Sequence, residues 1–279
     1  MLRVNEQGAA LASFFFGALD SHFLDLRTLF IIGFGLFCLS VASFVVNEYI
    51  DARDTDMYSA RIKSLTKTKV VPGAVLTLWL IFSGVGLLIL FEYRLFWQAI
   101  ITLILGTIYS LPPFRLKARF AYDMVCIYVY LILVPYSIGF SLTGTSFFQM
   151  FTIPFIALSC FLGVAEGIHL LGDLDADRKG GLHNTSVTIG YSNLLKLLVL
   201  LAFASTAGFL YLFYQHTHWW YYPLLFFIAI AILALGYARG NIYNPGKLIA
   251  RFSWATKIAV SFGNYLYIYQ IIVIYFLSR

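Results

Sequence analysis

The chain has 279 residues, of which 61% are hydrophobic and 11% are charged. Soluble domains carry about 25% charged residues, so the composition excludes a soluble globular protein and indicates an integral membrane protein. Nineteen Lys and Arg against thirteen Asp and Glu give a net charge of +6. In a membrane protein this excess describes topology first, because basic residues accumulate in cytoplasmic loops, and no nucleic acid partner is needed to explain it.

Apolar runs of about 20 residues are long enough to cross a bilayer as helices, and the chain lacks the strict alternation of an outer-membrane barrel. We therefore predict an all-α, polytopic membrane protein, a single domain over residues 1–279. The first span is short and is expected to be tilted, incomplete or half buried. Breaks at charged, Pro or Gly segments divide the chain into nine predicted transmembrane helices: 6–21, 28–50, 71–91, 93–111, 120–142, 149–171, 190–213, 218–238 and 255–277.

The basic residues also predict the orientation in the inner or plasma membrane. With a cytoplasmic amino terminus, every Lys and Arg except Arg27, Arg94 and Arg279 falls on the cytoplasmic side. The loops after the second, fourth, sixth and eighth spans then share the cytoplasmic face.

Two short stretches on that face hold most of the acidic residues. The first runs from Asn47 to Asp56 and the second from Gly172 to Lys179, and they contain four and three of the thirteen carboxylates. In a helix, residues four apart share a face, which aligns Asn47 with Asp51. Asp54 and Asp56 compete for the third position of the first stretch.

The second stretch repeats this spacing with Asp173 and Asp177, whereas Asp175 points elsewhere. Like charges at a membrane edge repel each other, so a cation is expected between the two stretches. All-oxygen ligands suit Mg²⁺, which leaves its remaining positions to water and substrate phosphates. A diphosphate held by Mg²⁺ fits this arrangement. The alternative for each stretch is a solvated, charge-rich loop, and Glu48 and Asp175 either support the ligands or face solvent.

The loop after the fourth span, Tyr109 to Arg119, contains three cations. Pro112 and Pro113 are expected to end the helix and force an extended turn. Arg grips phosphate oxygens with two parallel bonds, and Lys acts as a point charge. The alternative is anchoring at the membrane surface, which also applies to Tyr109. The predicted phosphate-binding residues are Arg61, Tyr109, Arg115, Lys117, Arg119, Arg178 and Lys179.

Two further carboxylates lie inside or beside spans. Glu166 is inside the sixth span, where an ionisable group is a functional candidate, although a hydrogen bond to Asn or Tyr across the bundle is equally possible. Asp123, at the start of the fifth span, is a candidate to pair with a loop arginine. No pair of histidines has zinc spacing on a face shared with the acids.

These motifs resemble those of the UbiA superfamily of intramembrane prenyltransferases. That family has the form NDxxDxxxD after its second helix and DxxxD after its sixth, similar here to Asn47–Asp56 and Asp173–Asp177. Tyr109 to Lys117 is similar to a loop of the branch that includes chlorophyll synthases and archaeal ether-lipid prenyltransferases. Glu48 replaces the usual Asp, Asp56 stands one residue late, and the usual Arg-Pro pairs are absent. These departures concern the acceptor more than the diphosphate site.

The resemblance implies an enzyme that moves a prenyl group from a polyprenyl diphosphate to an aromatic or lipid-like acceptor and releases diphosphate. Mg²⁺ would be held by both motifs, and Lys117, Arg115, Arg178 or Lys179 would neutralise the leaving group. Two enzymatic alternatives are a terpene cyclase and a phosphosugar prenyltransferase on the same scaffold. A divalent-cation transporter is the non-enzymatic alternative, although transporters tend to bind their cargo near the midplane.

Overall fold

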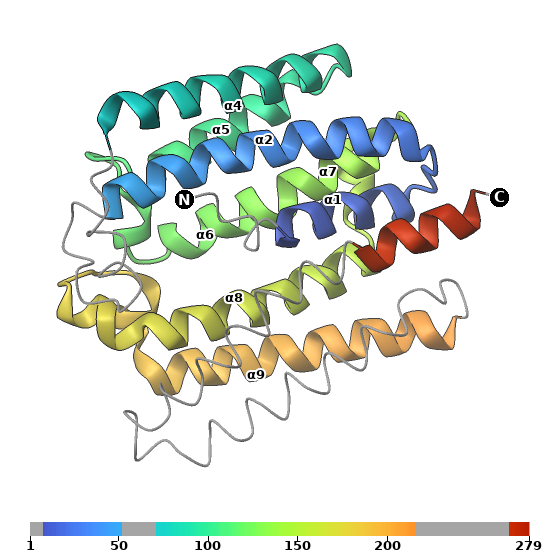
Figure 1. The fold of residues 1–279 in the computed structure, drawn as a ribbon. Helices are drawn as coiled ribbons and strands as arrows, with labels where there is room; N and C mark the ends of the chain where they lie inside the picture. The colour runs from blue at the N-terminus through green and yellow to red at the C-terminus, as the bar shows by residue number, and fades with distance from the viewer. Residues whose placement is uncertain (1–7, 52–70, 216–267, 279) are drawn as a thin grey trace.

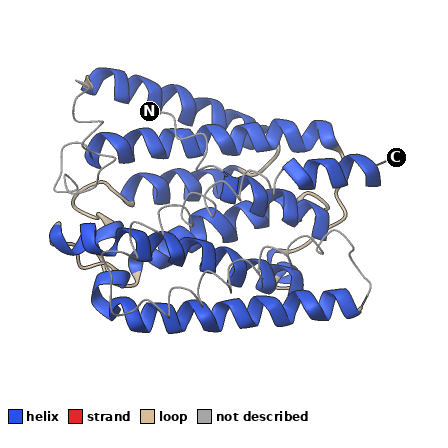
Figure 2. Cartoon of the chain, turned by 60° about the horizontal axis from the view of Figure 1, so that its bottom comes forward, coloured by secondary structure: helices blue, strands red, loops and turns tan. Residues whose placement is uncertain are grey.

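The computed structural model describes residues 8–51, 71–215 and 268–278. Within these ranges the chain is helical, with one isolated bridge between Arg119 and His183 and no strand (Figure 2). The longer elements are α1 (Gly8–Asp20), α2 (Leu26–Asp51), α4 (Pro72–Glu92), α5 (Phe96–Ile108), α6 (Tyr122–Tyr128), η4 (Val129–Leu133), α7 (Val134–Ser141), α8 (Ile153–Lys179) and α9 (Thr185–Tyr214). Short 3₁₀ turns, η3 (Leu116–Ala118) and η5 (Phe147–Met150), lie in loops, and a last helix covers Ile268–Leu277.

Five helical segments of the described chain are long and apolar enough to cross a membrane. They are Leu26–Asp51, Pro72–Glu92, Tyr122–Ser141, Ile153–Asp175 and Thr185–Tyr214, and α1, α5 and Ile268–Leu277 are shorter apolar helices. Large apolar side chains such as Leu88, Trp97 and Leu200 are well exposed, which suits contact with lipid and not with water. The predicted span 218–238 and most of 255–277 lie outside the described residues, so the predicted count of nine is not established.

The helices run back and forth, so the described loops gather at two opposite ends of the bundle (Figure 1). The carboxyl ends of α2, α5 and α8 lie at one end, together with the amino ends of α4, α6 and α9. We call this the motif end, because both acidic stretches reach it. The loops at residues 21–25, 93–95 and 142–152 lie at the other end.

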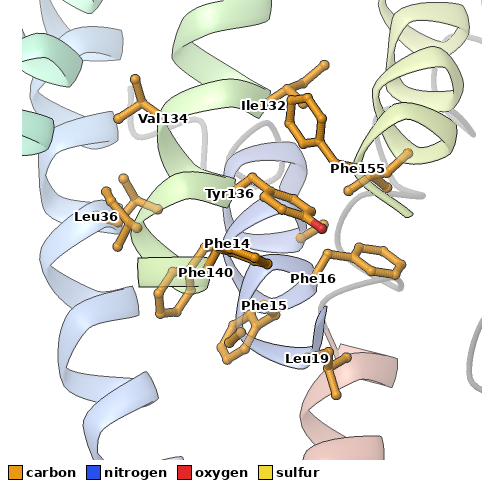
Figure 3. Close-up of a cluster of buried hydrophobic side chains, with 14 of the residues drawn as sticks. Phe14, Phe15, Phe16, Leu19, Leu36, Ile132, Val134, Tyr136, Phe140 and Phe155 are labelled. Atoms are coloured by element: carbon orange, nitrogen blue, oxygen red, sulfur yellow. The ribbon is translucent and has the colours of Figure 1, made fainter. Parts of the chain in front are cut away.

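The first helix is deeply buried in the bundle. Phe14 and Ala18 of α1 are completely buried, and Phe16 packs in the aromatic cluster around Tyr136 of α7 (Figure 3). The sequence predicted a short first span that is tilted, incomplete or half buried, and the helix observed is short and mostly buried. Other helices surround α1 on most sides. This explains how a helix of 13 residues is stable although it is shorter than the bilayer requires.

Glycines allow α1 and α7 to cross at close range. A Cβ on Gly17 would lie 2.1 Å from the Tyr136 carbonyl oxygen, and one on Gly139 would lie 2.0 Å from the Phe14 carbonyl oxygen. Small residues of this kind let helix backbones approach inside membranes. Asp20, at the end of α1, adds polar contacts to this crossing. Its Oδ2 accepts hydrogen bonds from the Tyr136 hydroxyl (2.7 Å) and from the Thr152 hydroxyl (2.9 Å).

Several predicted spans differ from the helices observed, and α9 for example begins at Thr185 and not at residue 190. The span predicted to end at residue 171 continues to Lys179, because charged residues do not stop a helix and the first strong breaker is Gly180–Gly181. The predicted continuous span 120–142 contains the π turn η4, which ends two residues before Pro135. Proline has no N–H for the helical ladder, so a wider turn is a common accommodation.

Candidate functional site

The first acidic stretch begins inside α2, whose last turns carry Asn47 and Asp51 on one face as predicted. Asp51 is 6% exposed and Glu48 is 8% exposed, so both carboxyl groups are buried at the motif end. Asp54, Asp56 and Arg61 lie outside the described residues.

The loop after α5 supplies the cation that meets this stretch. Lys117 Nζ donates to Asp51 Oδ1, and both side chains are about nine-tenths buried. The hydroxyl of Ser110, itself fully buried, donates to Asn47 Oδ1. Asn47, Asp51 and Lys117 were predicted from the sequence, whereas Ser110 was not, although it directly follows the predicted Tyr109.

The same loop is compact and not extended as predicted. The Arg115 N–H donates to the Leu111 carbonyl oxygen (2.9 Å) and the Lys117 N–H donates to the Tyr109 carbonyl oxygen (3.0 Å). Arg115 has a left-handed backbone (φ 40°), which reverses the chain and turns Lys117 toward α2. Arg119 is exposed and donates to the Pro113 carbonyl oxygen (2.9 Å), so its guanidinium folds back onto its own loop.

Tyr109 lies between the acidic groups of three elements. Burial raises the pKa of its phenol well above the usual value, and the carboxylates of Glu166, Asp123 and Asp51 raise this pKa further. The phenol therefore stays protonated at physiological pH and can donate a hydrogen bond.

The second acidic stretch is the last part of α8. Asp173 is about half exposed, and one of its oxygens lies 3.3 Å from His169 Nδ1. Asp177 Oδ2 accepts a hydrogen bond from Asn184 Nδ2 (2.7 Å). Arg178 and Lys179 are exposed in the last turn, where cations favour the negative end of the helix dipole.

Gly181 shapes the turn from α8 to α9. It adopts φ 71°, and the Leu182 N–H donates to the Asp177 carbonyl oxygen (3.0 Å), a typical glycine helix end. Asn184 then caps α9 by accepting from the Val187 N–H (3.1 Å). The Asn184 side chain thus both orients Asp177 and caps the amino end of α9. This double role was not predicted from the sequence.

A buried hydrogen-bond set ties this turn to the loop after α5. Asp123 is 1% exposed and accepts from both the hydroxyl and the N–H of Thr185, the latter at 2.9 Å. The Thr185 hydroxyl also accepts from the Ala121 N–H (2.9 Å), and Arg119 forms a backbone bridge with His183. The sequence offered a loop arginine as a partner for Asp123. The structure shows Asp123 accepting hydrogen bonds from Thr185.

The loop at residues 109–121 therefore connects the carboxyl end of α2 to the start of α9. Lys117 contacts Asp51 of α2, and the Ala121 N–H donates to the Thr185 hydroxyl of α9. In the described part of the chain, no three His, Cys, Asp or Glu side chains form a ready metal cluster. The helix ends that carry the acidic stretches instead lie at one end of the bundle, on separate helices (Figure 1).

The arrangement defines an integral membrane helical bundle with acidic and basic groups gathered at one end. The model of the UbiA prenyltransferase family matches residues 9–262, and the chain belongs to this family. No curated protein matches the chain at a significant level.

Solved structures share its fold. A UbiA homolog from Archaeoglobus fulgidus bound to DMAPP and Mg²⁺ has a TM-score of 0.68 at 18% identity, covering 95% of this chain and 98% of that one. An apo UbiA homolog from Aeropyrum pernix K1 has a TM-score of 0.70 at 15% identity, with 95% and 99% covered. A digeranylgeranylglyceryl phosphate synthase structure has a TM-score of 0.63 at 17% identity, with 97% and 96% covered.

Proposed function

We propose that this chain is a Mg²⁺-dependent intramembrane prenyltransferase of one domain, which moves a prenyl group from a polyprenyl diphosphate to an aromatic or lipid-like acceptor. Family membership supports the prenyltransferase class. The Archaeoglobus homologs bound to DMAPP or GPP with Mg²⁺ support the donor and the metal. The observation that carries the proposal is the buried pairing of Asp51 with Lys117 at the end of the bundle where the second acidic stretch also lies.

The residues present fit a magnesium site. Asn47, Asp51, Asp173 and Asp177 offer oxygen donors alone, and Lys117 already places a cation against Asp51. In the proposed site these residues hold the metal together with Asp54 or Asp56. Bound Mg²⁺ would neutralise charge on the diphosphate as it leaves.

The basic residues of the motif end supply the rest of the diphosphate site. Lys117 contacts Asp51 of the first stretch, Arg115 stands two residues before Lys117 in the chain, and Arg178 and Lys179 end the second stretch. Arg61, Arg119 and the Tyr109 hydroxyl are further candidates. Preplaced cations stabilise the charge that develops on the leaving oxygen and lower the barrier to breaking the allylic C–O bond. The prenyl tail would remain among apolar helices, with the motif end facing the cytoplasm.

The test is transfer of label from geranyl diphosphate, in membranes that contain the chain, to a hydroxybenzoate or to a glycerophosphate prenyl ether. Asp51→Asn and Asp173→Asn are expected to remove turnover while the protein still inserts, and Asp25→Asn at the opposite end of the bundle is the matched control. Wild-type turnover in both variants would refute the proposal. Cyclised hydrocarbon without acceptor product would indicate a cyclase, and metal flux without diphosphate release would indicate a transporter.

A further inference from the structure

Glu166 is a carboxylate that the proposed diphosphate site does not use. It lies in α8, seven residues before Asp173, between apolar turns of the helix. A charged group at such a position is costly in a membrane protein and is usually retained for a function.

The packing of α8 shows which way Glu166 faces. Val164, Ile168 and Leu171 of α8 are buried in a cluster with Leu198 of α9. At 3.6 residues per turn, Glu166 projects from nearly the opposite side of α8. That side also carries His169, Asp173 and Asp177, so Glu166 continues the acidic column from the motif end into the bundle.

Tyr109, in the loop that holds Lys117, lies within electrostatic range of Glu166. Among the carboxylates, Glu166 raises the pKa of the half-buried Tyr109 phenol most, ahead of Asp123. The carbonyl oxygen of Tyr109 accepts from the Lys117 N–H (3.0 Å), and Lys117 contacts Asp51. Glu166 therefore lies on the inner side of the same group of residues.

The depth of Glu166 along α8 indicates which part of a bound substrate it could reach. Seven residues correspond to about 10 Å along a helix axis, so Glu166 lies about that much deeper than Asp173. A prenyl diphosphate held at the motif end places its C1 carbon next to the diphosphate and its tail farther inward. An acceptor that attacks C1 from the side opposite the leaving diphosphate approaches from deeper in the bundle, which is the direction of Glu166 from Asp173.

We propose that Glu166 is the catalytic base of the acceptor half-site, and that it takes the proton from the acceptor's nucleophilic hydroxyl group. This inference rests on the proposed prenyltransferase function. The C1–O bond to diphosphate breaks and its electron pair leaves with the diphosphate. A lone pair of the acceptor oxygen forms the new bond to C1, and the hydroxyl proton moves to the Glu166 carboxylate. The Tyr109 phenol, a donor, orients the carboxylate or the acceptor oxygen.

The proposal selects an acceptor class. A base is useful to an acceptor that carries an ionisable hydroxyl, either a phenol or a lipid alcohol, and it adds nothing to an acceptor that is already an anion at the attacking atom. The site is therefore expected to take hydroxyl acceptors and to form an ether.

The experiment compares Glu166→Gln with Glu166→Asp and with Glu92→Gln, a control that removes an exposed carboxylate at the opposite end of the bundle. Ether formation is measured with labelled geranyl diphosphate, Mg²⁺ and the two acceptors named above. Binding is measured separately with an unreactive thio analogue of geranyl diphosphate, and thermal unfolding in detergent reports folding.

Glu166→Gln is expected to lower ether formation about 100-fold or more, the usual contribution of a general base, with analogue affinity within about twofold of wild type. Glu166→Asp, which keeps a carboxylate, is expected to retain more activity than Glu166→Gln. A purely structural role predicts the reverse order, because Gln preserves length and hydrogen bonding.

Three results would overturn the inference: ether formation by Glu166→Gln within about threefold of wild type, higher activity in Glu166→Gln than in Glu166→Asp, or parallel loss of analogue affinity. Failure of the proposed function itself gives a different pattern, in which the wild-type protein releases no diphosphate or Asp51→Asn and Asp173→Asn remain active.

Discussion

Lys117 and Asp51 form a buried ion pair that joins the loop after α5 to the carboxyl end of α2. A carboxylate and an ammonium at this depth stabilise each other, and removal of either partner leaves a buried charge. The pair also means that the proposed metal ligand already has a cation beside it before metal binds. Mg²⁺ and the Lys117 ammonium would therefore compete for, or share, one carboxylate.

Lys117→Met is expected to destabilise the metal-free protein by about 3–5 kcal/mol, because Asp51 loses its cationic partner. Added Mg²⁺ should restore more stability to this variant than to the wild type, since a metal can neutralise the same carboxylate. Thermal unfolding in detergent with and without Mg²⁺ measures both effects. Lys196→Met, an exposed position on α9, is the control. Equal Mg²⁺ stabilisation of Lys117→Met and wild type would contradict the competition.

Asn184→Ala removes both the cap of α9 and the hydrogen bond to Asp177. Loss of the cap should cost about 1 kcal/mol of stability. Loss of the hydrogen bond to a ligating carboxylate should raise the Mg²⁺ concentration needed for half-maximal turnover by roughly 10-fold. Asn193→Ala changes an exposed asparagine on the same helix and should leave the Mg²⁺ requirement unchanged. An unaltered requirement in Asn184→Ala would remove Asp177 from the proposed metal site.

Thr185→Val keeps the side-chain shape but deletes the hydroxyl that donates to Asp123. Asp123 is almost fully buried, so the lost hydrogen bond should cost about 1.5–3 kcal/mol. Thr188→Val, on the exposed side of α9, tests whether a general effect of valine explains the result. Thermal unfolding of both variants is the measurement, and similar midpoints would show that the Asp123 contact does not hold the two loops together.

Gly17→Ala places a methyl group against the backbone of α7, where the Tyr136 carbonyl oxygen would be 2.1 Å from it. The helices must separate, so we expect a loss of about 1–3 kcal/mol or more. Gly84→Ala in α4 adds the same methyl group where no atom lies within 4 Å and should be neutral or stabilising. If both variants unfold at the wild-type temperature, the close crossing of α1 and α7 does not contribute to stability.

Local patterns in the sequence were enough to predict the helical class, most spans and the shared face of each acidic column. Apolar length predicts a spanning helix, and a spacing of four residues predicts a common face, so Asn47 with Asp51 and Asp173 with Asp177 could be paired without coordinates. The alternation of spans also predicted that both stretches reach one end of the bundle.

Only the tertiary structure decided which partner each side chain meets. The contact between Lys117 and Asp51 depends on the left-handed turn at Arg115, which directs the following residues toward α2. The contacts of Asp123 with Thr185 join residues 62 positions apart, and no local pattern encodes such a pairing. The burial of α1 likewise depends on Gly139, a residue on another helix, because close packing is decided by both surfaces at once.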